Sequence, residues 1–125
     1  MIGSIRTPFF EYEKPLGYAF SSNLMSLLSD DEEIFKLLRS SIYLAIFTNK
    51  RMIFTYAPHS SLVPSDFEAE FISYKSIRSI SLLCNKNISN YNVEILTDID
   101  AFLQFCFSNS DDANAFVKTL NQYTV

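Results

Sequence analysis

The segment IYLAIFTNKRMIFTY, residues 42–56, indicates a chain that folds mainly as β-sheet. Two runs of aromatic and β-branched side chains flank the polar residues Asn49, Lys50 and Arg51, which is the pattern of a β-hairpin. The first run has no polar member, so both of its faces need a cover. The core should cover one face, and the N-terminal segment, a helix or another subunit should cover the other.

Composition and charge restrict the class of protein. The 125 residues are 48% hydrophobic and 15% aromatic, which fits one globular domain with a single core. The net charge of −4 and the scattered positions of the ten Lys and Arg residues argue against nucleic-acid binding, which needs bases gathered on one face. The longest apolar run is far shorter than the ~20 residues that span a bilayer, and no leader-like segment begins the sequence. We therefore expect a cytoplasmic protein.

Apolar and polar residues alternate through the middle of the chain in the manner of β-strands. Polar or proline-containing joints separate seven strand candidates. In the sixth, Tyr91, Val93 and Ile95 alternate with Asn92 and Glu94, which marks a sheet with one face in water. The expected strands are Ile34–Leu38, Ile42–Thr48, Met52–Tyr56, Phe67–Ile72, Ile77–Cys84, Tyr91–Thr97 and Ala101–Phe107.

The first 21 residues form an arm that differs from the domain that follows, residues 22–125. The arm contains both glycines, two of the four prolines and several aromatic residues, so we expect an irregular segment that packs on the domain or on a neighbouring subunit. A short helix, capped by Ser21 or Ser22, should then run to Leu28 and bury its three leucines. The acidic stretch SDDEE, residues 29–33, reads as a solvated turn.

The end of the chain predicts an amphipathic helix. Asn109 or Ser110 can cap its first turn, and two aspartates follow where the helix dipole favours negative charge. An apolar stripe at helical spacing comes next: Ala113, Phe116, Val117 and Leu120. Seven antiparallel strands followed by one such helix suggest a curled sheet or open barrel with the helix closing one mouth.

Three strings in this order resemble the bacterial pleckstrin-homology-like domain family of short proteins. They are DDEEIFKLLRSSIYLAIFTNKRMI at 30–53, ISYKSIRSISL at 72–82 and DDANAFVKTLNQY at 111–123, and the resemblance covers roughly residues 22–123. It implies a seven-stranded antiparallel pleckstrin-homology-like barrel capped by the C-terminal helix. It also implies assembly into ring-like homo-oligomers, and it favours a tight hairpin turn for the TNKR string.

Basic residues at turns are the candidate contacts for a partner or a lipid. Lys50 and Arg51, together with Lys75 and Arg78, form a weak basic patch if they converge, and otherwise serve as solvated edges. If Lys50 and Arg51 form only a hairpin tip, replacing both should change the free energy of unfolding by no more than about 0.5 kcal/mol. The candidate contacts in an oligomer are aromatic: Phe9, Phe10, Tyr12, Tyr43 and Phe47.

A phosphoinositide site and an enzyme active site both find little support. Only Lys36 and Arg39 lie near the first hairpin, and a multiply charged phosphate cluster needs more bases than two. The acidic run at 30–33 needs no catalytic explanation, and His59 has no evident carboxylate or oxyanion element beside it. With only two glycines in the chain, no nucleotide-binding loop is possible. We expect no catalytic residues and no cofactor.

A metal site is not expected either. Cys84 and Cys106 are the only cysteines and His59 is the only histidine, and their spacing does not suit structural zinc. Both cysteines lie in apolar segments, which favours reduced thiols in a core over a disulfide or a reactive thiol.

These observations favour a non-enzymatic module that self-assembles and binds an unidentified protein partner through a sheet edge, a groove or the arm. The alternative is a membrane-surface adaptor that binds anionic lipid weakly through the basic turns and the aromatics of the arm, Phe9, Phe10 and Tyr12. The net negative charge argues against membrane binding, because anionic lipid repels such a protein.

Overall fold

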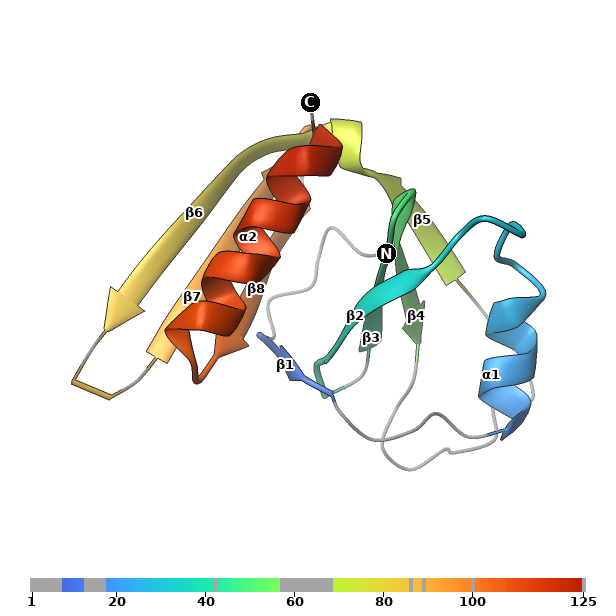
Figure 1. Ribbon diagram of the computed structural model, residues 1–125, viewed down its shortest axis with the longest axis horizontal. Coiled ribbons are helices and arrows are strands. Elements are labelled where there is room, and N and C mark those ends of the chain that lie inside the picture. Colours follow the sequence, from blue (N-terminus) through green and yellow to red (C-terminus); the bar gives the residue numbers. More distant parts are fainter. Residues whose placement is uncertain are drawn as a thin grey trace.

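The computed structural model describes residues 8–12, 18–41, 43–56, 69–85, 87–88, 90–99 and 101–124. Within these ranges, eight strands form one strongly curled sheet that carries a helix on each half (Figure 1). The elements are β1 (Phe9–Glu11), α1 (Tyr18–Met25), β2 (Ile34–Arg39), β3 (Tyr43–Thr48), β4 (Arg51–Tyr56), β5 (Ala69–Ser73), the 3-10 turn η2 (Tyr74–Ser76), β6 (Ile77–Asn85), β7 (Asn90–Thr97), β8 (Phe102–Phe107) and α2 (Ser110–Thr124).

The strand order β5-β4-β3-β2-β1-β8-β7-β6 makes the sheet a half-barrel. Strands β2 to β5 form one antiparallel meander and β6 to β8 form another. The short β1 joins the two meanders, pairing antiparallel with β2 and parallel with β8. The expected all-antiparallel set of seven strands is therefore incomplete: the arm supplies an eighth strand, with one parallel pairing. Three residues are too few to show an alternating pattern, and for that reason sequence periodicity missed β1.

The seven predicted strands are confirmed, with described boundaries within two residues of those expected. In β7, Val93 and Ile95 are buried while Leu96 is exposed, as the alternation predicts. β3 has buried side chains on both faces, in agreement with its unbroken apolar sequence. Local pattern was thus sufficient to find every strand except β1.

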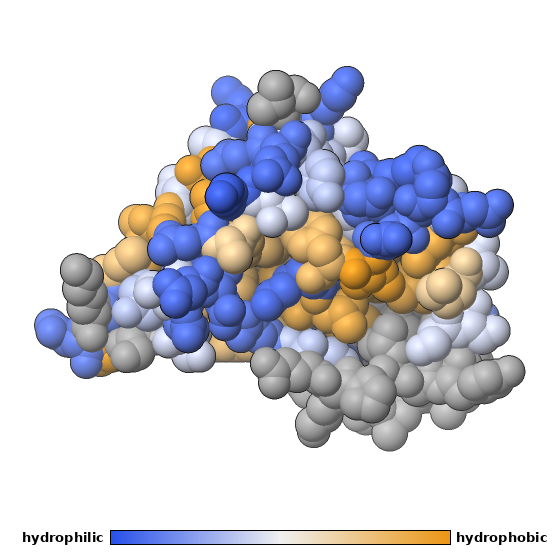
Figure 2. All heavy atoms as spheres, viewed as in Figure 1, coloured by the Kyte–Doolittle hydropathy of each residue, from blue (hydrophilic) through white to orange (hydrophobic). Residues whose placement is uncertain are grey.

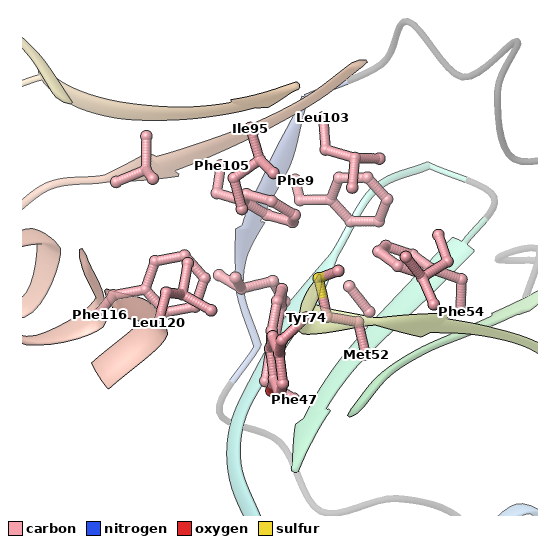
Figure 3. Close-up of a cluster of buried hydrophobic side chains, with 14 of the residues drawn as sticks. Phe9, Phe47, Met52, Phe54, Tyr74, Ile95, Leu103, Phe105, Phe116 and Leu120 are labelled. Atoms are coloured by element: carbon pink, nitrogen blue, oxygen red, sulfur yellow. The ribbon is translucent and has the colours of Figure 1, made fainter. Parts of the chain in front are cut away.

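The main core lies inside the curve of the sheet and is rich in phenylalanine. Figure 3 shows that side chains from both meanders and from α2 converge there. The ring centroid of Phe47 lies 5.3 Å from that of Phe105 and 4.9 Å from that of Phe116 on α2. Phe9 of the arm is fully buried in the same cluster, beside Phe54 and Phe105. The arm is therefore anchored in the core of its own chain.

A second apolar cluster covers the outer face of β3 and β4. Leu24 of α1 is 1% exposed and packs with Leu44, Ile46 and Ile53. Both faces of β3 are thus covered within one chain, so the unbroken apolar strand gives no reason to require a second subunit. Helix α1 starts earlier and ends earlier than expected, and Leu27 beyond its end is exposed rather than buried.

The C-terminal helix confirms its predicted pattern. Asn109 is the cap, because its Oδ1 accepts hydrogen bonds from the backbone N–H groups of Asp111 (2.7 Å) and Asp112 (3.3 Å). Ala113, Phe116 and Leu120 are buried against the sheet. In the described part of the chain, neither helix has the length and apolarity needed to cross a bilayer.

Candidate functional site

The basic hairpin turn lies against the acidic turn that follows α1. Figure 2 shows a polar cap at this end of the molecule, above an apolar strip that lies over β2. Arg51 binds Glu32 with two hydrogen bonds, from Nε to Oε2 at 3.0 Å and from Nη2 to Oε1 at 3.1 Å. The side chain of Glu32 is only 1% exposed. The expectation that residues 29–33 form a wholly solvated turn is therefore wrong at Glu32.

Thr48 completes the surroundings of this buried carboxylate. Its hydroxyl donates to Oε2 of Glu32 at 2.6 Å and accepts from the backbone N–H groups of Lys50 and Arg51 at 3.1 Å each. The backbone N–H of Ser29 donates to Oε1 of Glu32 at 3.2 Å. Burial by itself would raise the pKa of Glu32, but the hydrogen bonds from Thr48, Arg51 and Ser29 outweigh it and lower the pKa below its ordinary value.

Asn49 and Lys50 make further contacts with the acidic turn. Asn49 exchanges two hydrogen bonds with the backbone of Glu33, at 3.0 and 2.8 Å, and its Nδ2 donates to the carbonyl of Asp31 at 3.1 Å. Lys50 Nζ lies 2.8 Å from Oδ2 of Asp31, and the hydrogen bond from Lys50 lowers the pKa of that exposed carboxyl. We call residues 29–33 and 48–51 together the interlock. The basic turn thus binds the chain's own acidic turn.

The interlock also holds neighbouring elements. Arg51 Nη2 donates to the carbonyl of Leu27 at 2.7 Å, just beyond α1, and the guanidinium lies 4.4 Å from the ring centroid of Phe71 on β5. The hydroxyl of Tyr74 donates to the carbonyl of Thr48 at 2.5 Å, and the Tyr74 ring stacks on Tyr123 of α2. Burial raises the pKa of Tyr74, so its hydroxyl remains a donor. Both helices are therefore linked to one turn.

Lys75 and Arg78, the other two predicted contacts, lie outside the interlock. Lys75 is in η2 and Arg78 is near the start of β6, and both are exposed. Since Ser73 of β5 pairs with Arg51, Lys75 is at the same end of the sheet as the interlock. Neither base has an ion-pair partner among the described residues. The four bases therefore do not act as one group, because two are already paired with carboxylates.

The bases near the first hairpin are also engaged. Lys36 Nζ lies 2.8 Å from Oε1 of Glu11 and 5.5 Å from the ring centroid of Phe107, and Arg39 lies over the ring of Tyr12 at 5.6 Å. A shallow groove of about 320 Å³ runs along this part of β1 and β2. Its lining residues are Glu11, Tyr12, Ile34, Phe35, Lys36 and Leu37.

The five aromatic residues expected at an oligomer contact differ widely in exposure. Phe9 and Phe47 are 0% exposed within one chain, so they are core residues and cannot contact a neighbour. Phe10 is 56% exposed on β1, because its side chain lies on the opposite face of the strand from Phe9. Tyr12 and Tyr43 are half-buried. Of the five, Phe10 offers the largest accessible surface.

The cysteines are both free, but only one is partly buried. Cys106 is half-buried, and burial raises the pKa of its thiol. Cys84 is exposed on β6, so the expectation of a core position is wrong for it.

The lone histidine, His59, lies outside the described residues. In the parts of the chain that the structure describes, no three metal-ligating side chains of His, Cys, Asp or Glu come together.

The ends of the sheet offer another kind of candidate site. Within the described sheet, β5 and β6 each pair with only one neighbour. β6 is nine residues long, and six of its side chains are exposed: Arg78, Ser79, Ser81, Leu83, Cys84 and Asn85. Which strands form edges depends on topology, and no local sequence signal identifies them. The burial and pairing of Glu32 could not be predicted from local sequence for a similar reason. Its partners Thr48 and Arg51 lie 16 and 19 residues away in the chain.

Comparisons with known proteins identify the fold. No family model matches the sequence, and no curated protein matches it. A DUF1696 family protein with a pleckstrin-homology domain from Shewanella loihica PV-4 matches in structure with a TM-score of 0.62 and 14% identity, covering 95% of this chain and 99% of that one. A pleckstrin homology domain from Shewanella amazonensis SB2B matches with a TM-score of 0.55 and 19% identity, covering 88% and 98%. Together with the capped half-barrel, these matches show that the chain has the pleckstrin-homology-like fold.

Proposed function

We propose that this protein is a non-enzymatic interaction module that self-assembles and binds a protein partner through the edges of its sheet. The observation that carries the proposal is that, within the described sheet, β5 and β6 each pair on one side only, and β6 is the longer of the two. A long edge strand presents unpaired backbone donors and acceptors to any extended segment. β6 has no proline and only one charged residue, Arg78. Its register shifts between Ile77 and Ser79, at the start of the strand, so only the part beyond Ser79 lacks the features that usually protect an edge.

Self-association is also what the resemblance to the bacterial pleckstrin-homology-like family implies. The fold of the two Shewanella structures agrees with that resemblance. Leu83 on β6, which is 51% exposed, adds apolar surface to this edge. An edge with apolar side chains beside it suits a protein partner better than water.

The interlock disfavours the lipid-binding alternative. Lys50 is paired with Asp31, and Arg51 is paired with a nearly inaccessible Glu32. An anionic headgroup that took Arg51 would leave a buried carboxylate without its main partner, which costs several kcal/mol. The net charge of −4 adds repulsion from anionic membranes.

An edge-blocking variant tests the proposed function. Light scattering of the unmodified protein should give a mass above that of one chain, 14.4 kDa, at micromolar concentration. Ser81→Lys adds a charge to the middle of β6 and should lower both this mass and the capture of partners by immobilised protein. Asn114→Lys adds the same charge at an exposed position of α2 and is the control. A mass of one chain over a tenfold concentration range, with sedimentation on anionic vesicles at low salt, would instead support the lipid adaptor.

A further inference from the structure

The short arm strand β1 fills a slot between the two meanders. It lies between β2 and β8, and in the described sheet these two strands are joined only through it. Its pairing covers Phe10 and Glu11 on the side of β2 and Phe9 and Phe10 on the side of β8. So short a strand makes few backbone hydrogen bonds, and its side chains must therefore supply most of the hold on the slot.

Two side chains of the arm have places built for them in the slot. Phe9 is 0% exposed, and its ring centroid lies 5.9 Å from that of Phe54 and 5.2 Å from that of Phe105 (Figure 3). Two positions later, Oε1 of Glu11 accepts a hydrogen bond from Nζ of Lys36 at 2.8 Å, and these side chains are only 19% and 28% exposed. The slot thus selects an aromatic residue followed, two positions later, by a carboxylate.

The slot is longer than the strand that fills it. β1 runs antiparallel to β2, and after Glu11 the backbone N–H of Tyr12 donates to the carbonyl of Leu37 at 3.1 Å. Beyond that bond, no described residue pairs with β2 on this side. The shallow groove of about 320 Å³ lies here, lined by residues 34–37 of β2 together with Glu11 and Tyr12. A strand that continued past the position of Glu11 would run along this groove.

We propose that the slot between β2 and β8 binds an extended segment of a partner protein and that β1 is its built-in competitor. The partner segment has an aromatic residue for the pocket of Phe9, a carboxylate for Lys36 two positions later, and a continuing strand for the groove. Binding by strand addition takes affinity from the main chain and specificity from alternate side chains. The site lies within the sheet, so it does not depend on the edges β5 and β6 proposed above.

A foreign segment suits the slot better than the arm of a second copy. The chain's own arm is tethered, because α1 follows it in sequence and packs on the outer face of the sheet through Leu24. Tethering gives a short segment an effective concentration in about the millimolar range. An identical arm from another copy makes the same contacts without that advantage. A longer segment that also pairs along the groove gains contacts that the arm lacks.

A peptide that copies the arm tests the slot. The probe is TPFFEYE, residues 7–13, and fluorescence anisotropy measures its binding to the full chain. The peptide should bind Phe9→Ala at least about tenfold more tightly than the unmodified protein, because the tethered ring no longer competes. Phe10→Ala, which leaves the pocket filled, is the matched control and should bind like the unmodified protein. If Phe9→Ala does not fold, Glu11→Lys loosens the arm without opening the core. A folded variant of either kind that does not bind the peptide would overturn the site.

Charge exchange tests the role of Lys36. The peptide TPFFKYE should bind Phe9→Ala about tenfold more weakly than TPFFEYE does, because it brings a second cation to Lys36. Adding Lys36→Glu to Phe9→Ala should reverse the preference, so that TPFFKYE becomes the tighter ligand. Equal binding of the two peptides by both proteins would overturn the assignment of the carboxylate position.

Peptide length tests the groove. TPFFEYEVTV adds three alternating residues and should bind Phe9→Ala at least about threefold more tightly than TPFFEYE, because it can pair further along β2. Equal affinity would overturn the continuation of the slot into the groove.

The source of the segment is tested by mass. A dimer of the unmodified protein that TPFFEYE dissociates and Ser81→Lys does not would show exchange of arms between copies, and would overturn the assignment to a partner protein. Peptide binding that is equal in Ser81→Lys and in the unmodified protein would support a site independent of β6.

Discussion

At the scale of single residues, a buried carboxylate decides the role of the basic turn. Lys50 and Arg51 are neighbours in sequence, yet Lys50 meets the exposed Asp31 and Arg51 meets the buried Glu32. Exposed ion pairs contribute little to stability, whereas removing one partner of a buried pair leaves a charge without compensation. The two bases therefore have different importance for the fold.

Replacing each base separately shows this difference. Arg51→Ala should lower the free energy of unfolding by about 2–3 kcal/mol, because Glu32 then loses two charge-assisted hydrogen bonds in a buried place. Lys50→Ala, the matched control, should cost no more than about 0.5 kcal/mol. Urea unfolding measures both. Equal small losses would show that the turn is only a solvated hairpin tip, as one interpretation of the sequence had it.

The lowered pKa of Glu32 predicts a particular acid dependence. A carboxyl whose pKa is lower in the folded chain stabilises the fold above its unfolded pKa, and the contribution is lost as the pH falls through the folded value. The contribution of ionised Glu32 to the free energy of unfolding should therefore be fully present above its ordinary pKa of 4.5 and should decline as the pH falls below that value. Urea unfolding from pH 7 to pH 3 should show a steeper loss for the unmodified protein than for Glu32→Gln, which does not titrate. If the free energy of unfolding fell equally steeply with pH in both proteins, the lowered pKa of Glu32 would be contradicted.

Two buried threonines on the sheet provide a matched pair. Thr55 is 0% exposed, and its hydroxyl has no hydrogen-bond partner among the described residues. Thr97 is 1% exposed, and its hydroxyl bonds the carbonyl and the N–H of Ala101 at 3.0 Å each. Thr55→Val should raise the free energy of unfolding by about 1 kcal/mol, and Thr97→Val should lower it by a similar amount. Thermal unfolding of both variants checks the sign of each change. A lower stability in both would refute the inference that the Thr55 hydroxyl is buried without a hydrogen bond.

At the scale of elements, the shortest strand connects the two halves of the sheet. β1 is three residues long, but it pairs with β2 on one side and with β8 on the other. Its backbone bonds are few, so its position depends mainly on the packing of Phe9 between the two meanders. Helix α1 is held in a similar way. Among its described side chains, Leu24 is the buried one, and Arg51 bonds the backbone of Leu27 just beyond the helix.

The arm strand can be tested at two adjacent positions. Phe9→Ala should lower the free energy of unfolding by about 3–4 kcal/mol, because it removes a fully buried ring next to Phe54 and Phe105. Phe10→Ala removes a ring that is 56% exposed and should cost no more than about 0.5 kcal/mol. Equilibrium unfolding in urea gives both values. Similar effects at the two positions would show that the arm does not enter the core in solution.

At the scale of the whole molecule, the half-barrel has two apolar clusters and, within the described sheet, two edge strands, β5 and β6. The inner cluster and α2 fill the curve of the sheet, and α1 covers the outside of one meander. No described helix lies on the outer face of the other meander, where Leu96 and Phe102 are paired and both partly exposed. The proposed self-association therefore rests on the edge strands of the described sheet and not on an exposed core.

Sequence alone was sufficient for features that depend on near neighbours. Seven strands, the C-terminal helix and its Asn109 cap follow from alternation, helical spacing and a hydrogen bond to the next turn. These signals extend over a few residues, so they survive without knowledge of the fold. The resemblance in the three quoted strings also pointed correctly to the pleckstrin-homology-like fold.

Only the tertiary structure decided what depends on residues far apart in the chain. The burial of Glu32 requires Thr48 and Arg51 to arrive from the next hairpin, and β1 becomes a strand only where β2 and β8 leave a place for it. The same holds for the side chains that cover β3 and for which strands lie at the ends of the described sheet. Side-chain period is a local property, whereas burial and pairing are set by segments that meet only when the whole chain is folded.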